Sequence, residues 1–146
     1  MSDARKQTAR RFLEDVFTAG RFEVADELVA ENVVDHDPAL PGGQVTGIDA
    51  VKELVTGYRA AFPDIRMTVE DQVAEGDQVT TRWKAVGTHD GDFWGMEPTG
   101  KQATVTGITI DRFDGDRIAE SWTNWDTFGL MVQLGAIPTP TTATSS

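Results

Sequence analysis

Apolar residues recur at helical spacing in three segments of the first half of the chain. The segments contain Ala9, Phe12, Leu13, Val16 and Phe17; Phe22, Ala25, Leu28 and Val29; and Val51, Leu54, Val55, Tyr58 and Phe62. Intervals of three and four residues place such side chains on one face of a helix, so three amphipathic helices are predicted. Gly20 and Pro63 follow the first and third segments and predict where those helices end. The stretch VVDHDPALPGG (33–43) predicts a loop, because it holds two prolines and two glycines.

The pattern changes after Ile65, where segments rich in Val, Ile, Thr and Trp begin. These segments are 66–76, 77–89, 101–113 and 116–125. Glu75-Gly76-Asp77 and Asp114-Gly115-Asp116 are turn signals, so the segments predict antiparallel strands joined by hairpins. A last apolar segment, FGLMVQLG (128–135), predicts a short helix. Helices followed by strands indicate an α+β fold with the helices on one face of a curved sheet, and a pocket between the two layers is the default site.

Composition excludes several classes of function. The 24 acidic and 13 basic residues give a net charge of -11, which repels nucleic acids and anionic membrane surfaces. The absence of cysteines excludes disulfides, thiolate nucleophiles and cysteine-bound zinc, and two histidines are too few for a His-rich metal site. The first fifteen residues contain no apolar stretch of the kind found in signal peptides, and no run of about 18 apolar residues occurs. We therefore expect a cytoplasmic protein with no nucleic-acid, membrane or metal partner.

Both histidines are candidates for proton transfer. His36 lies between Asp35 and Asp37, whose carboxylates would favour its protonated form and orient the ring as an acid or base. The alternative is a loop histidine that caps a turn. His89 lies in a turn-rich loop, and we expect it to be exposed.

Asp126 is a second candidate acid or base, because it follows Asn124 and Trp125, and desolvation against indole rings would raise its pKa. Its alternative role is the N-cap of the last helix, for which Asp is a preferred residue. Asp111 and Arg112 fall on opposite faces of their strand, so only one of them can face a pocket.

The aromatic residues of the second half predict a wall for a planar polycyclic ligand, although a hydrophobic core would have the same pattern. They are Trp83, Phe93, Trp94, Trp122 and Trp125, together with Met96. If 117–125 is one strand, alternation separates its side chains into two faces. Ser121, Thr123 and Trp125 then face one side, and Ile118, Glu120, Trp122 and Asn124 face the other. Both tryptophans can line one cavity only if a bulge intervenes.

Several segments resemble the SnoaL-like polyketide cyclases of the nuclear-transport-factor-two-like superfamily. The resemblance rests on VVDHDP (33–38), GTHDGDFWGMEPTGK (87–101), VTGITIDRF (105–113) and the segment from Asp114 to Gly135. It implies a cone in which a curved, mainly antiparallel sheet wraps around helices and encloses a hydrophobic pocket, commonly in a homo-oligomer. We expect this cone to span 1–137 as one domain, with 138–146 as a flexible tail, since PTPTTATSS lacks large apolar residues.

The resemblance also implies a chemistry, from which this sequence departs. Cyclases of the family close a ring in anthracycline biosynthesis by an intramolecular aldol condensation without a cofactor. Their acid/base is an aspartate directly after the position that matches Trp122, and a histidine that matches Thr109 assists it. Here the aspartate is replaced by Thr123, whose hydroxyl has no useful basicity near neutral pH. Relatives that lost these residues look like hydroxylation proteins of the same pathways.

Three hypotheses follow. The first is hydroxylation of an anthracycline-type polyketide without a tightly bound cofactor, with a partner reductase or NADPH as an external requirement. The second is a cofactor-free cyclase with its acid/base relocated to Asp126 or Asp111, and the third is a protein that only binds small molecules. The candidate catalytic residues are His36, Asn124 and Asp126, and the candidate substrate-binding residues are Trp83, Trp94, Met96, Thr109, Trp122, Thr123 and Trp125.

Overall fold

The computed structural model describes residues 2–138 of the chain. The helices are α1 (Ser2–Arg11), η1 (Phe12–Thr18), α2 (Phe22–Leu28), η2 (Pro41–Gly43), α3 (Ile48–Ala61) and α4 (Thr127–Gln133). The strands are β1 (Val29–His36), β2 (Gln44–Thr46), β3 (Arg66–Glu75), β4 (Gln78–Thr88), β5 (Gln102–Asp114) and β6 (Arg117–Trp125). The α+β class is therefore confirmed. Apart from Pro138, the predicted tail lies outside the described residues.

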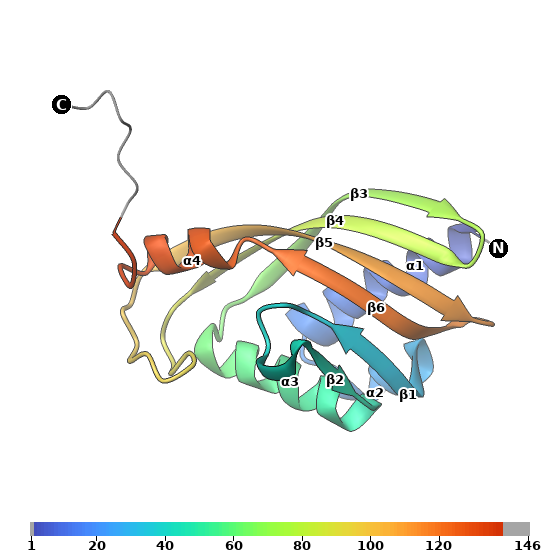
Figure 1. Cartoon of the computed structure of the whole chain (residues 1–146), viewed down its shortest axis with the longest axis horizontal. Helices are drawn as coiled ribbons and strands as arrows, with labels where there is room; N and C mark the ends of the chain where they lie inside the picture. Colours follow the sequence, from blue (N-terminus) through green and yellow to red (C-terminus); the bar gives the residue numbers. More distant parts are fainter. Residues whose placement is uncertain (1, 139–146) are drawn as a thin grey trace.

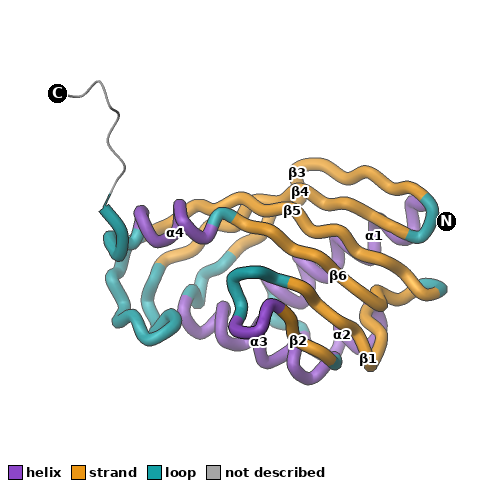
Figure 2. Tube along the Cα trace, viewed as in Figure 1, coloured by secondary structure: helices purple, strands orange, loops and turns teal. Residues whose placement is uncertain are grey.

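Within the described part, the strands form one curved sheet in the order β2-β1-β6-β5-β4-β3. All neighbours pair antiparallel except β1 and β6, which run parallel. The sheet curves around α1 and α3, while α4 continues from the end of β6 (Figure 1). The loop between β4 and β5 lies at the same end of the sheet as α4 (Figure 2). No helix among residues 2–138 is both long and apolar enough to cross a membrane.

The three predicted amphipathic helices and the four predicted strands are all present. The first helix turns from α-helical to π-helical geometry at Phe12 and continues to Thr18. The predicted loop at 33–43 is wrong in its first part, because Val33–His36 belongs to β1. Polar residues interrupt this strand, so its own sequence has no strong strand signal. It is extended because β6 on one side and β2 on the other supply its hydrogen-bond partners.

The main core lies between the helices and the inner face of the sheet. Its buried members from the helices are Ala9, Val16, Val24, Ala25, Leu28, Val51 and Val55. Those from the sheet are Val29, Val33, Val79, Phe113 and Ile118. Alternation had grouped Ile118 with Glu120, Trp122 and Asn124, which is wrong, because Ile118 lies in this core. The pairing of β5 with β6 shifts register between Arg112 and Phe113, and this bulge turns Ile118 inward.

The loop between β4 and β5 is anchored by His89. Its side chain is fully buried, so the expectation of an exposed residue is wrong. Nδ1 accepts a hydrogen bond from the Thr99 backbone N–H at 3.2 Å, and the Thr99 hydroxyl lies 3.0 Å from the same atom. The ring packs against Phe62 at 5.5 Å between centroids. The buried His89 ring thus connects the start of this loop to Thr99 near its end.

Glycine at position 91 is required by a close approach of two backbones. Gly91 N–H donates to the Ala61 carbonyl at 3.1 Å, and a Cβ on Gly91 would overlap the Ala60 carbonyl. We predict that Gly91→Ala lowers the free energy of unfolding by about 1 to 3 kcal/mol, the range found for overpacked sites. Urea denaturation measures this change.

Gly57→Ala is the matched control, because Gly57 lies in α3 and a Cβ there would meet no atom within 4 Å. It should stabilise the protein by up to about 1 kcal/mol through helix propensity. Equal effects of the two substitutions would contradict the proposed close approach at Gly91.

Candidate active site

A hydrophobic cavity of about 150 Å³ lies between the helices and the inner face of the sheet. Its apolar lining includes Phe12, Leu13, Phe17, Val33, Phe62 and Phe93. Its polar lining consists of Asp35, Asp37, Tyr58, Thr81, Thr109, Asp111, Ser121 and Thr123, with the indoles of Trp83 and Trp125. A few polar groups in an apolar cavity are typical of a small-molecule site.

Strand pairing arranges the polar groups in rows across the sheet. The first row joins β1, β6 and β5, since Asp35 pairs with Ser121 and Ser121 pairs with Asp111. The Ser121 hydroxyl donates to Asp111 Oδ1 at 2.6 Å, and both side chains are buried. Two carboxyl groups with a hydroxyl between them therefore lie on the wall of the cavity.

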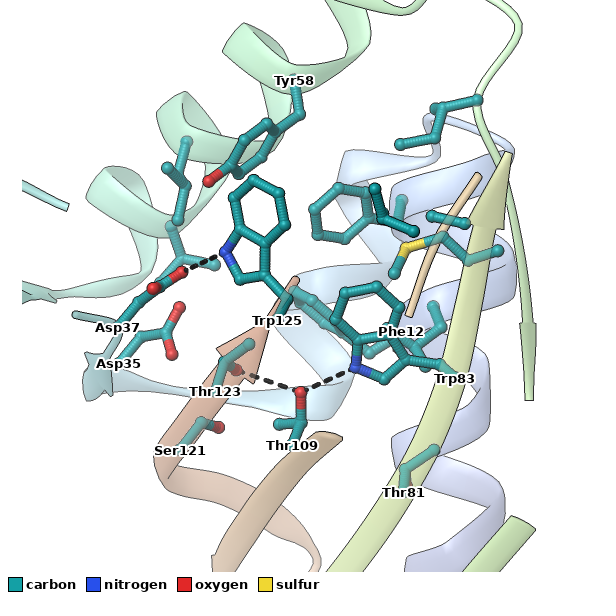
Figure 3. A pocket seen from close by; sticks show the side chains of 18 of the residues that line it. Phe12, Asp35, Asp37, Tyr58, Thr81, Trp83, Thr109, Ser121, Thr123 and Trp125 are labelled. Atoms are coloured by element: carbon teal, nitrogen blue, oxygen red, sulfur yellow. Dashed lines mark hydrogen bonds between the residues drawn. The ribbon is translucent and has the colours of Figure 1, made fainter. Parts of the chain in front are cut away.

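The second row consists of threonines. Thr123, Thr109 and Thr81 pair across β6, β5 and β4. The hydroxyls of Thr109 and Thr123 share a hydrogen bond of 3.0 Å, as Figure 3 shows. The positions that the resemblance matches to the cyclase histidine and aspartate are thus direct neighbours in the cavity, where both carry hydroxyls.

The third row consists of two indoles separated by a glycine. Gly107 pairs with Trp83 on one side and with Trp125 on the other. A Cβ on Gly107 would overlap the Trp83 ring, so the glycine makes room for the indole. Trp83 Nε1 donates to the Thr109 hydroxyl at 3.0 Å, which holds the ring against the second row.

Asp35 has the most perturbed carboxyl group of the site. Burial, followed by the charges of Asp37 and Asp111, raises its pKa to about 7, although His36 acts in the opposite direction. Burial also raises the pKa of Asp111 to about 6, against the hydrogen bond from Ser121. Asp35 therefore exchanges its proton near neutral pH, where an acid/base group is most effective.

Asp37 differs from Asp35 because both of its oxygens are engaged. Trp125 Nε1 donates to Oδ2 at 3.1 Å, and the Ala39 backbone N–H donates to Oδ1 at 2.9 Å. Asp37 is also buried. It thus orients the Trp125 ring in the cavity, and its charge contributes to the raised pKa of Asp35.

The structure brings together only some of the predicted site residues. Trp83, Thr109, Thr123 and Trp125 line the cavity. His36, Trp94, Met96, Trp122, Asn124 and Asp126 are not among the lining residues. Asn124 is exposed, because alternation along β6 turns it away from Thr123 and Trp125. The predicted separation of Trp122 from Trp125 is confirmed.

His36 and Trp122 form a cluster away from the cavity. Their rings stack at 5.4 Å between centroids, and His36 Nε2 donates to Glu120 Oε2 at 2.7 Å. Arg112 Nε donates to the other oxygen of Glu120 at 3.2 Å. The hydrogen bond from His36 is the main cause of the lowered pKa of Glu120. The expectation that Arg112 and Asp111 face opposite sides is met, since Asp111 faces the cavity.

Asp126 is the N-cap of α4. Its Oδ1 accepts a hydrogen bond from the Gly129 backbone N–H at 2.8 Å, and the residue is exposed. The alternative role predicted for Asp126, the N-cap of the last helix, is therefore confirmed. The predicted burial of Asp126 against indole rings is wrong, because the residue is exposed.

Trp94 and Met96 lie in the loop between β4 and β5. Trp94 is 50% exposed, has a φ of 49° and stacks on Phe93 at 4.3 Å between ring centroids. Its centroid lies 6.1 Å from that of Trp125. Met96 donates its backbone N–H to the Phe93 carbonyl at 2.8 Å. Both residues support Phe93, which is the residue of this loop that enters the cavity.

Asp35 and Tyr58 are site residues that the sequence pattern does not reveal. Helical spacing places Tyr58 on the apolar face of its helix. Asp35 lies in 33–43, whose prolines and glycines predict a loop, so the pattern assigns it no face. Had Val33–His36 been recognised as a strand, alternation from the apolar Val33 would have placed Asp35 inward and His36 outward.

The chain is similar to known proteins in both sequence and structure. The family model of the SnoaL-like polyketide cyclases matches residues 7–134. No match is found among curated protein sequences. IdmH of Streptomyces antibioticus, provisionally described as a polyketide cyclase, is 33% identical with a TM-score of 0.79, over 90% of this chain and 98% of IdmH.

Two further solved structures are similar. A protein of Acidithiobacillus ferrooxidans, also provisionally described as a polyketide cyclase, is 33% identical with a TM-score of 0.82, over 91% of this chain and 95% of that chain. AclR of Streptomyces galilaeus, provisionally described as a hydroxylase, is 26% identical with a TM-score of 0.81, over 94% of this chain and 84% of AclR. The predicted cone architecture is confirmed.

The capping role of Asp126 can be tested by two substitutions. We predict that Asp126→Ala lowers the free energy of unfolding by about 1 kcal/mol, since the Gly129 N–H loses its acceptor. Asp126→Asn should leave stability nearly unchanged, because Asn caps helices as well as Asp. Urea denaturation distinguishes the two variants. Equal losses would contradict the capping role.

The raised pKa of Asp35 predicts a pH dependence of stability. Its pKa is about 7 in the folded protein and about 4 in the unfolded chain. The folded state therefore binds more protons between these values, so this contribution to stability is full below about pH 4 and is lost as the pH rises through about 7.

Asp35→Asn removes the loss of stability that the ionisation of Asp35 causes at higher pH. We predict that the variant is more stable than the wild type at about pH 8, by up to about 4 kcal/mol, and that the difference shrinks toward about pH 4. Urea denaturation across this range measures it. The free energy of unfolding of the variant should still fall with rising pH, in part because the pKa of Asp111 is also raised. Parallel pH profiles for the two proteins would contradict the raised pKa of Asp35.

Proposed function

The chain belongs to the SnoaL-like polyketide cyclase family, and on this basis we propose that it catalyses a cofactor-free, aldol-type ring closure with Asp35 as the acid/base. The resemblance predicted from the sequence is thereby confirmed at the level of the family. The proposal is a version of the relocated acid/base hypothesis. It assigns the role to Asp35 in place of Asp126, which caps a helix and is exposed.

The carboxyl group of Asp35 carries the proposal. It lines a cavity whose other walls are mostly apolar, and its pKa of about 7 gives both protonation states near neutral pH. Its Oδ1 is buried and has no hydrogen-bond partner among residues 2–138. A carboxyl group that is desolvated and left without a partner is costly for the fold, and such strain is typical of a functional site.

The proposed reaction consists of two proton transfers and one bond formation. The Asp35 carboxylate removes a proton from the carbon next to a substrate carbonyl, which leaves an enolate. The enolate carbon then attacks a second carbonyl of the same substrate, so that a carbon–carbon bond forms and the attacked oxygen becomes an alkoxide. Protonated Asp35 returns its proton to that alkoxide. The Asp35 carboxylate is regenerated, and no oxidant or reductant is consumed.

The threonines and indoles have a different role in this proposal. Thr109 and Thr123 occupy the positions that match the cyclase pair, but their hydroxyls serve to bind substrate oxygens and do not act as bases at neutral pH. Trp83 and Trp125 offer flat apolar surfaces to a cyclic product. Asp111 is the alternative acid/base, because it lines the same cavity and has a raised pKa.

Hydroxylation of a polyketide is a second candidate, supported by the 26% identity to AclR, which is provisionally described as a hydroxylase. In this case the cavity would hold an electron-rich phenolate, molecular oxygen would supply the inserted oxygen atom, and a reductase with NADPH would supply electrons. An oxygenated product that depends on these additions, from a phenolic polyketide precursor, would favour this candidate. Binding with neither reaction would favour a small-molecule carrier.

Enolisation can be tested without knowing the natural substrate. 2-Tetralone is a compact bicyclic ketone with acidic C–H groups, and NMR in D₂O follows their exchange for deuterium. We predict that the protein accelerates this exchange and that Asp35→Asn lowers the acceleration by about 10²-fold or more, the scale of general acid–base catalysis. The wild-type rate should rise with pH as Asp35 ionises, around the pKa of about 7.

Asp126→Asn is the matched control, since it removes a carboxylate that lies outside the cavity and keeps the helix cap. It should exchange deuterium at the wild-type rate. Equal rates for Asp35→Asn and the wild type would overturn the assignment, and a loss confined to Asp111→Asn would move the role to Asp111.

A further inference from the structure

The Tyr58 hydroxyl is a second polar group in the cavity that lacks a partner. Within residues 2–138, three buried side-chain atoms have no hydrogen bond: Asp35 Oδ1, Tyr58 Oη and His89 Nε2. Only Asp35 and Tyr58 belong to residues that line the cavity. A buried hydroxyl without a partner costs about 1 to 3 kcal/mol, so its place in an apolar cavity calls for an explanation.

Tyr58 extends from α3 and is held between aromatic rings. Its ring stacks on Phe17 at 6.0 Å between centroids, and it lies 6.1 Å from Phe93 and 6.2 Å from Trp125, edge to face with the latter. Contacts on several sides restrict the rotation of the ring. In Figure 3 its hydroxyl is directed toward the side of the cavity where Asp35 and Asp37 lie. The position of the hydroxyl is therefore set before any ligand enters.

The neighbours of Tyr58 keep its hydroxyl protonated and available as a donor. Burial and the charges of Asp37 and Asp35 raise the pKa of Tyr58 well above its usual value. Asp37 accepts hydrogen bonds from Trp125 and from the backbone, and neither is supplied by Tyr58. An O–H group that cannot ionise and has no acceptor in the described chain is suited to an acceptor that arrives with the substrate.

We propose that the Tyr58 hydroxyl binds the substrate oxygen on which negative charge develops, opposite the carbon that Asp35 deprotonates. This inference rests on the proposed function and names its substrate class, which is an enolisable carbonyl compound with an adjacent apolar ring system. The O–H donates to the carbonyl oxygen, and the bond strengthens as that oxygen becomes an enolate oxygen. A preformed donor of this kind needs no rearrangement at the moment of reaction.

An enolate analogue tests this role without turnover. 4-Nitro-1-naphthol is ionised in weakly alkaline buffer, and its naphtholate oxygen resembles that of an enolate on a flat ring. Titration at about pH 8, followed by the absorbance of the naphtholate, gives its Kd. We expect Tyr58→Phe, which removes only the hydroxyl, to weaken binding of the naphtholate by about tenfold or more, as expected for a hydrogen bond to a charged group.

Naphthalene is the control ligand, because it has the same ring system without the oxygen. Wild type and Tyr58→Phe should bind it equally, with Kd measured from tryptophan fluorescence, which also shows that the variant keeps its fold. Asp35→Asn should bind the naphtholate at least as tightly as the wild type, since one negative charge is removed from the cavity. Equal naphtholate affinities for wild type and Tyr58→Phe would overturn the proposal, as would failure of the wild type to bind either compound.

The outcomes separate this inference from the proposed function. If Asp35→Asn exchanges deuterium like the wild type, but naphtholate binding depends on Tyr58, the acid/base assignment fails and the oxygen site remains. If exchange depends on Asp35, but naphtholate binding is indifferent to Tyr58, the assignment of Tyr58 fails alone.

Discussion

The parallel pairing of β1 with β6 is the constraint on which the candidate site depends. The register places Asp35 beside Ser121, and the antiparallel pairing of the next strand places Ser121 beside Asp111. Two carboxyl groups from segments far apart in the chain thus lie in one row, on either side of Ser121. The same pairing turns His36 outward onto Trp122. A shift of β1 by one residue would exchange the faces of Asp35 and His36 and remove the acid/base from the cavity.

The cavity combines apolar burial with unpaired polar groups. Asp37 and Thr109 are held by indole N–H groups, so part of the polar lining is satisfied by the protein itself. Asp35 Oδ1 and Tyr58 Oη have no such partner in the described chain. Burial without compensation raises the pKa of both groups, which makes one a proton carrier near neutral pH and keeps the other a donor. Burial without a hydrogen-bond partner thus lowers the stability of the protein and, at the same time, gives both groups the protonation behaviour that the reaction needs.

The motif residues that carried the resemblance have structural roles. Thr99, in the segment 87–101, holds the buried His89, and this anchors the loop that carries Phe93 into the cavity. Gln133 accepts from the Thr104 N–H and donates to the Thr104 carbonyl, each at 2.8 Å, so it joins α4 to β5. These residues therefore indicate the fold family but not the reaction, because residues that hold a fold together need not contact a substrate.

By itself, the sequence determined the three amphipathic helices and the four long strands, because local periodicity and turn residues govern these features. The family followed from the resemblance of particular segments, and the family model confirms it. The sequence also separated Trp122 from Trp125, since alternation is a local property of a strand. Only the tertiary structure decided that Val29–His36 is a strand and that Asp35 is the perturbed acid of the cavity. The reason is that β1 is extended by pairing with a strand more than eighty residues away, and the pKa of Asp35 depends on burial and on carboxylates brought close by that pairing.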